Sequence, residues 1–129
     1  MTATQGFITF LATTVVLLVF VTLTGWKAKR KQHLTLVALA VVSLAITIYW
    51  AEQLGEEYNL ETAGAITPIH LWLAKITVVC YALPVITGIA TIKNARRRLV
   101  HRKVAFLVLG LTLVTFLTGL AMILGSEPI

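Results

Sequence analysis

Four long apolar runs constrain the fold of this chain more than any other feature. They are residues 7–26, 34–50, 71–92 and 104–124. Because an α-helix rises about 1.5 Å per residue, roughly 20 residues cross a hydrocarbon core about 30 Å thick. Hydrophobic residues make up 58% of the sequence and charged residues only 12%, which is typical of membrane proteins rather than small soluble domains. The runs predict an all-α fold, an integral membrane four-helix bundle. The predicted helices cover about residues 7–26, 33–51, 70–92 and 103–124.

The charged residues are sorted between the segments that connect the runs. All but one of the 11 lysines and arginines lie at residues 27–31 and 93–103, whereas the glutamates lie at residues 52–61 and at the C-terminus. The positive-inside rule places the basic segments in the cytoplasm and both termini on the non-cytoplasmic side. The pattern predicts a multi-pass protein of a bacterial inner (plasma) membrane. The net charge of +6 then reflects basic residues that meet anionic lipid headgroups of the bilayer, and we do not expect nucleic acid as a partner.

The connections are too short to hold a further domain, so residues 1–129 are predicted to form a single transmembrane domain. Tight inner connections predict that helices 1 and 2 are antiparallel neighbours, as are helices 3 and 4. After the second run, the helix is expected to continue for a turn or two before Asn59, Gly64 and Pro68 break it.

Two residues of the third run need a separate explanation. Lys75 is the one cation outside the basic segments. It is expected either to extend to the outer interface and meet Glu52 or Glu56, or to bind a quinone headgroup or an anion. Pro84 removes a backbone donor and frees the carbonyl near Cys80, so we expect a kink there.

The chemistry of the chain depends on its three histidines, His33, His70 and His101, each of which is expected to open or precede a helix. Followed at spacings of three and four, each begins the smallest and most polar stripe of its helix. The stripes of the second half are Ala74, Thr77, Tyr81, Pro84, Gly88 and Thr91 after His70, and Ala105, Val108, Thr112, Thr115, Gly119 and Met122 after His101. Small and hydroxyl residues line helix contacts in membrane bundles, so we expect the histidines to point inward.

Two interpretations of the cytoplasmic pair of histidines remain open. In the first, the stripes are ordinary packing seams, and the histidines bind headgroups, water or helix ends. In the second, His33 and His101 lie at one membrane level and ligate haem b between them. That site needs two imidazoles, a slot with little side-chain bulk, and cations near the propionates. The candidate cations are Arg98, Arg102 and Lys31.

His70 lies at the opposite membrane level, about 25 Å from the other two histidines if the helices span fully. It therefore needs a different site. Its possible partners are Met122, near the outer end of the last helix, and Glu52 or Glu56. With Met122, His70 could hold haem or copper. Alternatively, His70 caps the helix that begins after Pro68.

Several motifs are absent from the sequence. No aspartate or glutamate lies inside an apolar run, which disfavours a proton-coupled transporter. The hydrolase and nucleotide-binding motifs GxSxG, HExxH and the Walker sequence are missing, as are CxxC and CxxCH. With no hydrolase or transferase motif, an electron-transfer role is the most that we expect of this chain as an enzyme.

Residues 74–124 resemble small four-helix bacterial membrane proteins of unknown function, whose genes are often found near haem-copper oxidase assembly genes. The resemblance rests on Ala82-Leu83-Pro84, Arg96-Arg97-Arg98, His101-Arg102-Lys103 and Thr118-Gly119. In that family a histidine is expected in helix 3 about where Lys75 stands, whereas His70 lies more than a turn earlier. The resemblance implies a respiratory-membrane setting with a haem or metal role. A looser similarity to small four-helix b-type cytochromes implies the same.

Together these patterns predict a small respiratory-type membrane protein that binds haem or metal through inward-facing histidines. Electrons would pass between the cofactor and a quinone or a partner redox protein. The alternative is a non-catalytic accessory or assembly subunit of a larger respiratory membrane complex. A small transporter or channel is a third hypothesis, disfavoured by the lack of carboxylates inside the apolar runs.

Overall fold

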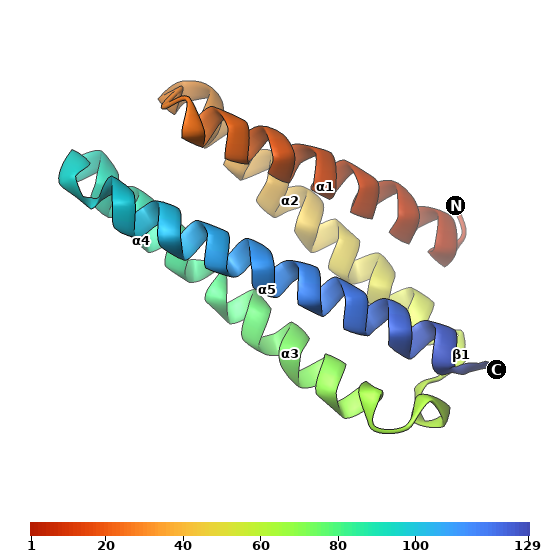
Figure 1. Ribbon diagram of the computed structural model, residues 1–129. Coiled ribbons are helices and arrows are strands. Elements are labelled where there is room, and N and C mark those ends of the chain that lie inside the picture. The colour runs from red at the N-terminus through yellow and green to blue at the C-terminus, as the bar shows by residue number, and fades with distance from the viewer. The chain divides into compact units, whose positions relative to one another are not determined.

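The computed structural model describes all of residues 1–129 and divides them into two compact units, Met1–Tyr58 and Asn59–Ile129. The first unit is a hairpin of α1 (Ala3–Trp26) and α2 (Arg30–Gly55), shown in Figure 1. The longer elements of the second unit are α3 (Ile66–Cys80), α4 (Ala82–Lys93) and α5 (Arg98–Gly125). Its short elements are the 3-10 turns η1 (Leu60–Ala63) and η2 (Ala95–Arg97) and the strand β2 (Glu127–Pro128), which pairs with β1 (Tyr58–Asn59). The single transmembrane domain over residues 1–129 stays a prediction.

Four helical segments are long and apolar enough to cross a membrane, which confirms the number predicted from the hydrophobic runs. They are Ala3–Trp26, Arg30–Gly55, Ile66–Lys93 and Ala95–Gly125. Each begins before its predicted start, and the last three also end later than predicted, because capping and charged residues can continue a helix where hydropathy falls. At the start of α1, Gln5 N–H donates to Thr2 Oγ1 (3.2 Å) and Thr2 N–H donates to Gln5 Oε1 (3.1 Å). This capping box begins α1 at Ala3 and not at residue 7.

The predicted start of the third helix is wrong. Helix α3 begins at Ile66, and Pro68 lies inside its first turn. Proline is tolerated there because the N–H that it lacks would have no partner within the helix. The chain turns before α3 at Gly64, whose φ of 72° lies in the left-handed region that favours glycine. His70 therefore lies in the second turn of α3 and does not cap the helix.

The helix is interrupted three residues before Pro84, in the region where the sequence predicts a kink. Helix α3 ends at Cys80 and α4 begins at Ala82, with Tyr81 between them. Pro84 cannot donate to the carbonyl of Cys80, four residues earlier, and its ring crowds that carbonyl. The N–H of Tyr81 still lies 3.1 Å from the Thr77 carbonyl, so the helix is interrupted only locally.

Helix neighbours follow the prediction: α1 packs against α2, and α5 packs against both α3 and α4 (Figure 1). The buried polar residues outnumber the buried apolar ones. They are Thr14, Thr24, Ser43, Thr47, Thr67, Thr77 and Ser126, against Ala40, Leu54, Val108 and Met122. Bulky aliphatic side chains are exposed instead, as Val79 (73%) and Leu107 (66%) illustrate. This distribution fits helices whose outer faces meet lipid.

Helices α1 and α2 are joined by a hydroxyl cluster in the middle of their interface. Thr14 Oγ1 lies 2.8 Å from Ser43 Oγ and 3.0 Å from Thr47 Oγ1. Near the start of α1, Gly6 lets the indole of Trp50 lie against the backbone, since a Cβ there would come within 2.3 Å of the ring. The two contacts fix which faces of α1 and α2 meet.

We expect Thr14→Val to lower the stability of the α1–α2 hairpin by about 1 kcal/mol, in the range measured for side-chain hydrogen bonds between membrane helices. Its neighbour provides the control: Thr13 is exposed, and its hydroxyl donates to the Thr9 carbonyl of the same helix (2.8 Å). Thr13→Val should leave the free energy of unfolding nearly unchanged. The measurement is an unfolding titration in mixed micelles, and equal losses in the two variants would contradict the role given to the cluster.

Candidate functional site

Each of the three histidines lies in the first or second turn of its helix. His33 and His101 are in the first turns of α2 and α5, and His70 is in the second turn of α3. All three are half-buried. Each imidazole contacts a neighbouring helix of its own unit, which agrees with the inward orientation predicted from the stripes.

His33 contacts the end of α1. Its Nδ1 lies 2.9 Å from the carbonyl oxygen of Val21 and 3.4 Å from Thr24 Oγ1. The ring also approaches Gly25 so closely that a Cβ at this position would lie 2.9 Å from the imidazole Cε1. The contact therefore needs both the polar groups and the missing side chain of the glycine.

His101 makes a similar contact with α4. Its Nδ1 lies 3.0 Å from Thr87 Oγ1. A Cβ at Gly88, the next residue, would lie 3.2 Å from the imidazole Cε1. The imidazole of His101 thus connects the first turn of α5 to α4.

His70 contacts α5 near its C-terminal end. Its Nδ1 lies 3.0 Å from Thr118 Oγ1. A Cβ at Gly119 would lie 2.7 Å from the imidazole Cε1, which is closer than real Cβ atoms come. The contact joins residues 48 positions apart in the chain.

The three contacts share one sequence feature, a Thr-Gly pair on the neighbouring helix. The sequence contains three such pairs, at residues 24–25, 87–88 and 118–119, and each contacts one of the three histidines. The stripes pointed to Gly88 and Gly119 as helix-contact residues, but reasoning from the sequence missed the threonines that bond the imidazoles. The sequence did contain one signal for these contacts, because it has as many Thr-Gly pairs as histidines.

Further hydroxyl pairs continue the seam between α5 and the other helices of the second unit. Thr77 Oγ1 lies 2.7 Å from Thr115 Oγ1, and the Tyr81 hydroxyl lies 2.7 Å from Thr112 Oγ1. All four residues belong to the stripes predicted from the histidine positions. Closer to His101 along α5, the buried residue is the apolar Val108, which is 1% exposed, and the row of hydroxyl pairs ends there.

The residues predicted to bind haem are divided between the two units. His33 belongs to the first unit and His101 to the second. Arg98 lies three residues before His101 on α5 and is exposed, while Arg102 follows His101 and is half-buried. Residues three apart share a helix face, so Arg98 and His101 lie on the same side of α5. The sharing of one haem by His33 and His101 stays a prediction.

His70 faces α5 through Thr118, and Met122 lies on the same face of α5 as Thr118. Met122 is 6% exposed and lies one turn beyond Thr118, whose hydroxyl bonds His70. No group of three or more histidine, cysteine, aspartate or glutamate residues lies close enough to hold a metal ion. A site formed by His70 and Met122 stays a prediction.

Lys75 lies on an exposed face of α3, where its Nζ is 5.3 Å from the centre of the Trp72 ring. This is a cation–π contact, which stabilises an ammonium group at an interface. Reasoning from the sequence considered glutamates for Lys75 and missed the aromatic ring one turn earlier. The pairing of Lys75 with Glu52 or Glu56 stays a prediction.

Fold and site together define an all-helical protein with four helices, each long and apolar enough to span a membrane, and with three histidines held on helix seams. Comparisons with models of known protein families, with characterised proteins and with solved structures found no match to this chain. The resemblance to the small four-helix membrane proteins therefore rests on the residue patterns alone.

Proposed function

We propose that this chain is a small membrane protein of the respiratory type that binds haem or a metal ion through its histidines and takes part in electron transfer. The contact between His33 and the Val21 carbonyl is the observation that best supports the proposal. A carbonyl oxygen only accepts hydrogen bonds, so Nδ1 of His33 is the donor. In the neutral imidazole, Nε2 then carries the lone pair. Histidines that ligate metals usually donate their second N–H to a carbonyl in this way.

The proposed roles of the residues follow the sequence prediction. His33 and His101 would be the axial ligands of haem b, with Arg98 and Arg102 near the propionates. His70, with Met122, would hold a second haem or a copper ion, because imidazole and thioether groups both suit these metals. The bound group would supply one-electron chemistry. The protein would hold the ligand rings in place and keep water from the seam.

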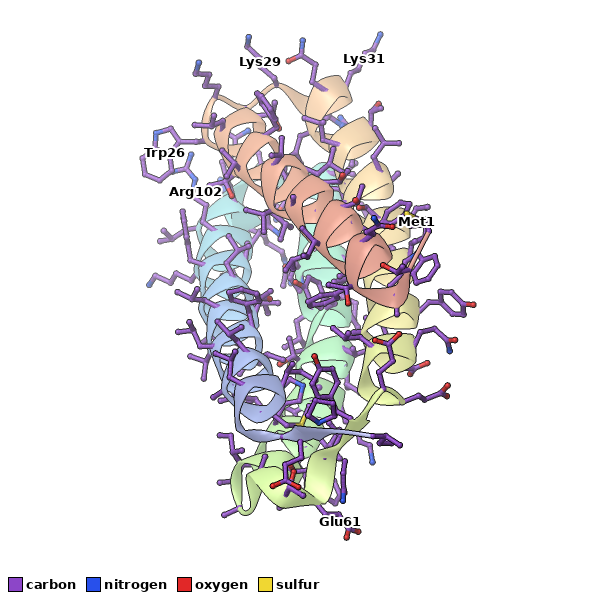
Figure 2. All side chains as sticks on the ribbon, turned by 90° about the vertical axis from the view of Figure 1, so that its right-hand side faces the viewer. Met1, Trp26, Lys29, Lys31, Glu61 and Arg102 are labelled. Carbon is purple, nitrogen blue, oxygen red and sulfur yellow. The ribbon has the colours of Figure 1, made fainter.

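The proposed setting is a bacterial inner membrane, with both termini on the non-cytoplasmic side and a quinone or a larger respiratory complex as partner. The charge distribution supports this orientation. Figure 2 shows Lys29 and Lys31 extending away from the turn that joins α1 and α2. Within the second unit, Glu61 and Arg102 lie towards opposite ends. In each unit the lysines and arginines of the basic segments lie towards one end of the helices, and the positive-inside rule assigns that end to the cytoplasm.

The test of this proposal is the visible absorption spectrum of the purified protein with its His33→Ala and His101→Ala variants. We expect a Soret band and, after reduction, an α-band, and each variant should lose the part of both bands that comes from the haem between His33 and His101. Thr35→Ala provides the control, because Thr35 is exposed on the same helix as His33. Its hydroxyl donates a hydrogen bond to the Lys31 carbonyl of that helix and contacts no other helix through it. A colourless, metal-free protein that co-purifies with a larger membrane complex would contradict the proposal and support the accessory-subunit alternative.

A further inference from the structure

We infer that Thr118 and Thr87 are positioning residues, which hold His70 and His101 in the tautomer with the proton on Nδ1 and the lone pair on Nε2. The role of these threonines in ligand binding rests on the proposed function, but the tautomer itself does not. It follows from the number of protons that each hydroxyl can donate. A threonine hydroxyl has one hydrogen and two lone pairs, so it donates once and accepts at its remaining sites.

At His70, the hydroxyl proton of Thr118 is already in use. Thr118 Oγ1 donates to the Thr115 carbonyl oxygen at 2.9 Å. The same Oγ1 lies 3.0 Å from Nδ1 of His70, and towards that nitrogen it can only accept. Nδ1 must therefore supply the hydrogen, which leaves Nε2 unprotonated in the neutral ring.

The same count applies at the other end of the second unit. Thr87 Oγ1 donates to the Leu83 carbonyl oxygen at 2.8 Å, within its own helix. Its contact with Nδ1 of His101, at 3.0 Å, is then one in which the hydroxyl accepts. His101 therefore has the same tautomer as His70, although the two rings extend from different helices.

In the first unit, a backbone carbonyl and not a threonine hydroxyl determines the tautomer of His33. Nδ1 of His33 lies 2.9 Å from the Val21 carbonyl oxygen, which has no proton to give. Thr24, the threonine of that Thr-Gly pair, donates to the Phe20 carbonyl oxygen at 2.8 Å. All three histidines thus carry the proton on Nδ1, and in each case the partner lies on a neighbouring helix.

The glycine of each pair makes the close approach possible. A Cβ at residues 25, 88 or 119 would lie 2.9, 3.2 or 2.7 Å from the imidazole Cε1. The ring reaches the threonine hydroxyl only because no side chain stands between the two backbones. At His70 and His101 the Thr-Gly pair therefore works as a unit, in which the hydroxyl selects the tautomer and the glycine provides the space.

A fixed Nδ1–H has a chemical consequence for the opposite nitrogen. Hydrogen bonding from Nδ1–H raises the basicity of Nε2 and fixes the ring orientation. Neutral imidazoles bind haem iron, copper and zinc through such an unprotonated nitrogen. The ligand class that His70 fits is thus a haem iron or a divalent transition metal bound through Nε2.

The test is ¹⁵N NMR of the full chain in lipid bilayers, with ¹⁵N-labelled histidine and at a pH at which the imidazoles are neutral. The three signals are assigned by replacing one histidine at a time. We expect a protonated Nδ1 for His70, His101 and His33. Nδ1 is a suitable reporter because it keeps its proton whether or not a metal binds Nε2.

The variants separate a positioning role from a merely structural one. Thr118→Val should remove the preference of His70 and give a mixture of tautomers, whereas Thr118→Ser should restore a protonated Nδ1. The control is Thr91→Val, since the Thr91 hydroxyl donates to the Thr87 carbonyl of its own helix (2.8 Å). It should leave all three histidine signals unchanged.

The wild-type spectrum alone can overturn the inference, even if a variant fails to fold. A proton on Nε2 of His70 or His101 in the wild-type protein would contradict it, whatever cofactor is present. A colourless protein with protonated Nδ1 atoms would instead support the inference while contradicting the proposed haem function. The two claims can therefore fail separately.

Discussion

Val79→Arg is expected to prevent the third apolar segment from entering a membrane. Val79 lies near the middle of the span Ile66–Lys93, and its side chain is 73% exposed. A guanidinium group at the centre of a spanning helix costs about 2.5 to 3.5 kcal/mol on insertion scales. That cost applies only if this face of α3 meets lipid. We expect most of the variant protein to be lost from the membrane fraction, as measured by fractionation and immunoblotting of cells that express it.

The control for this variant is Val79→Leu, which keeps the side chain apolar and should leave membrane accumulation unchanged. In a protein that is not embedded in a bilayer, an exposed arginine is well tolerated, since surface substitutions usually change stability little. Equal amounts of the arginine variant and the wild-type protein in the membrane fraction would therefore contradict a spanning role for residues 66–93.

Gly119→Ala is expected to have the second largest effect, because the added methyl group would lie 2.7 Å from Cε1 of His70. Either the ring must leave its position and lose the Thr118 contact, or α3 and α5 must move apart. Overpacking of this kind typically costs about 1 to 3 kcal/mol. The measurement is the free energy of unfolding in mixed micelles, combined with the NMR signal of His70.

The same helix offers a matched control in Gly110, around which there is no atom within 4 Å of an added Cβ. Alanine is favoured over glycine in a helix by about 1 kcal/mol, so Gly110→Ala should leave the protein unchanged or slightly more stable. If both alanine variants were equally stable, the close contact between His70 and Gly119 would not be part of the folded protein.

The sequence was sufficient to predict the helices and the break in the third one. The apolar runs gave the number of spanning segments, since a bilayer sets one characteristic length. Pro84 indicated a distortion of the third helix, because the effect of a proline on the preceding turn is local and steric. Helix ends were predicted less well, because caps such as Thr2 with Gln5, and a proline such as Pro68 in a first turn, do not register in a hydropathy pattern.

The candidate site was predicted only in part. Periodicity correctly placed the histidines on polar stripes, because spacing along one helix decides which residues share a face. It could not show that His70 would meet Thr118, since that contact depends on the register between two helices that are distant in the sequence. The choice of haem ligands depends on how separate helices are arranged, which spacing along a single helix does not fix.

The central claim is that the histidines bind haem or a metal ion through Nε2. Its most direct test is the reduced-minus-oxidised absorption spectrum of the wild-type protein, purified from its own membranes, with the haem and metal content measured on the same sample. The account predicts a b-type α-band, or bound copper, in stoichiometric amount with the chain. Protein purified in this way with no absorption band, no haem and no bound metal would contradict it.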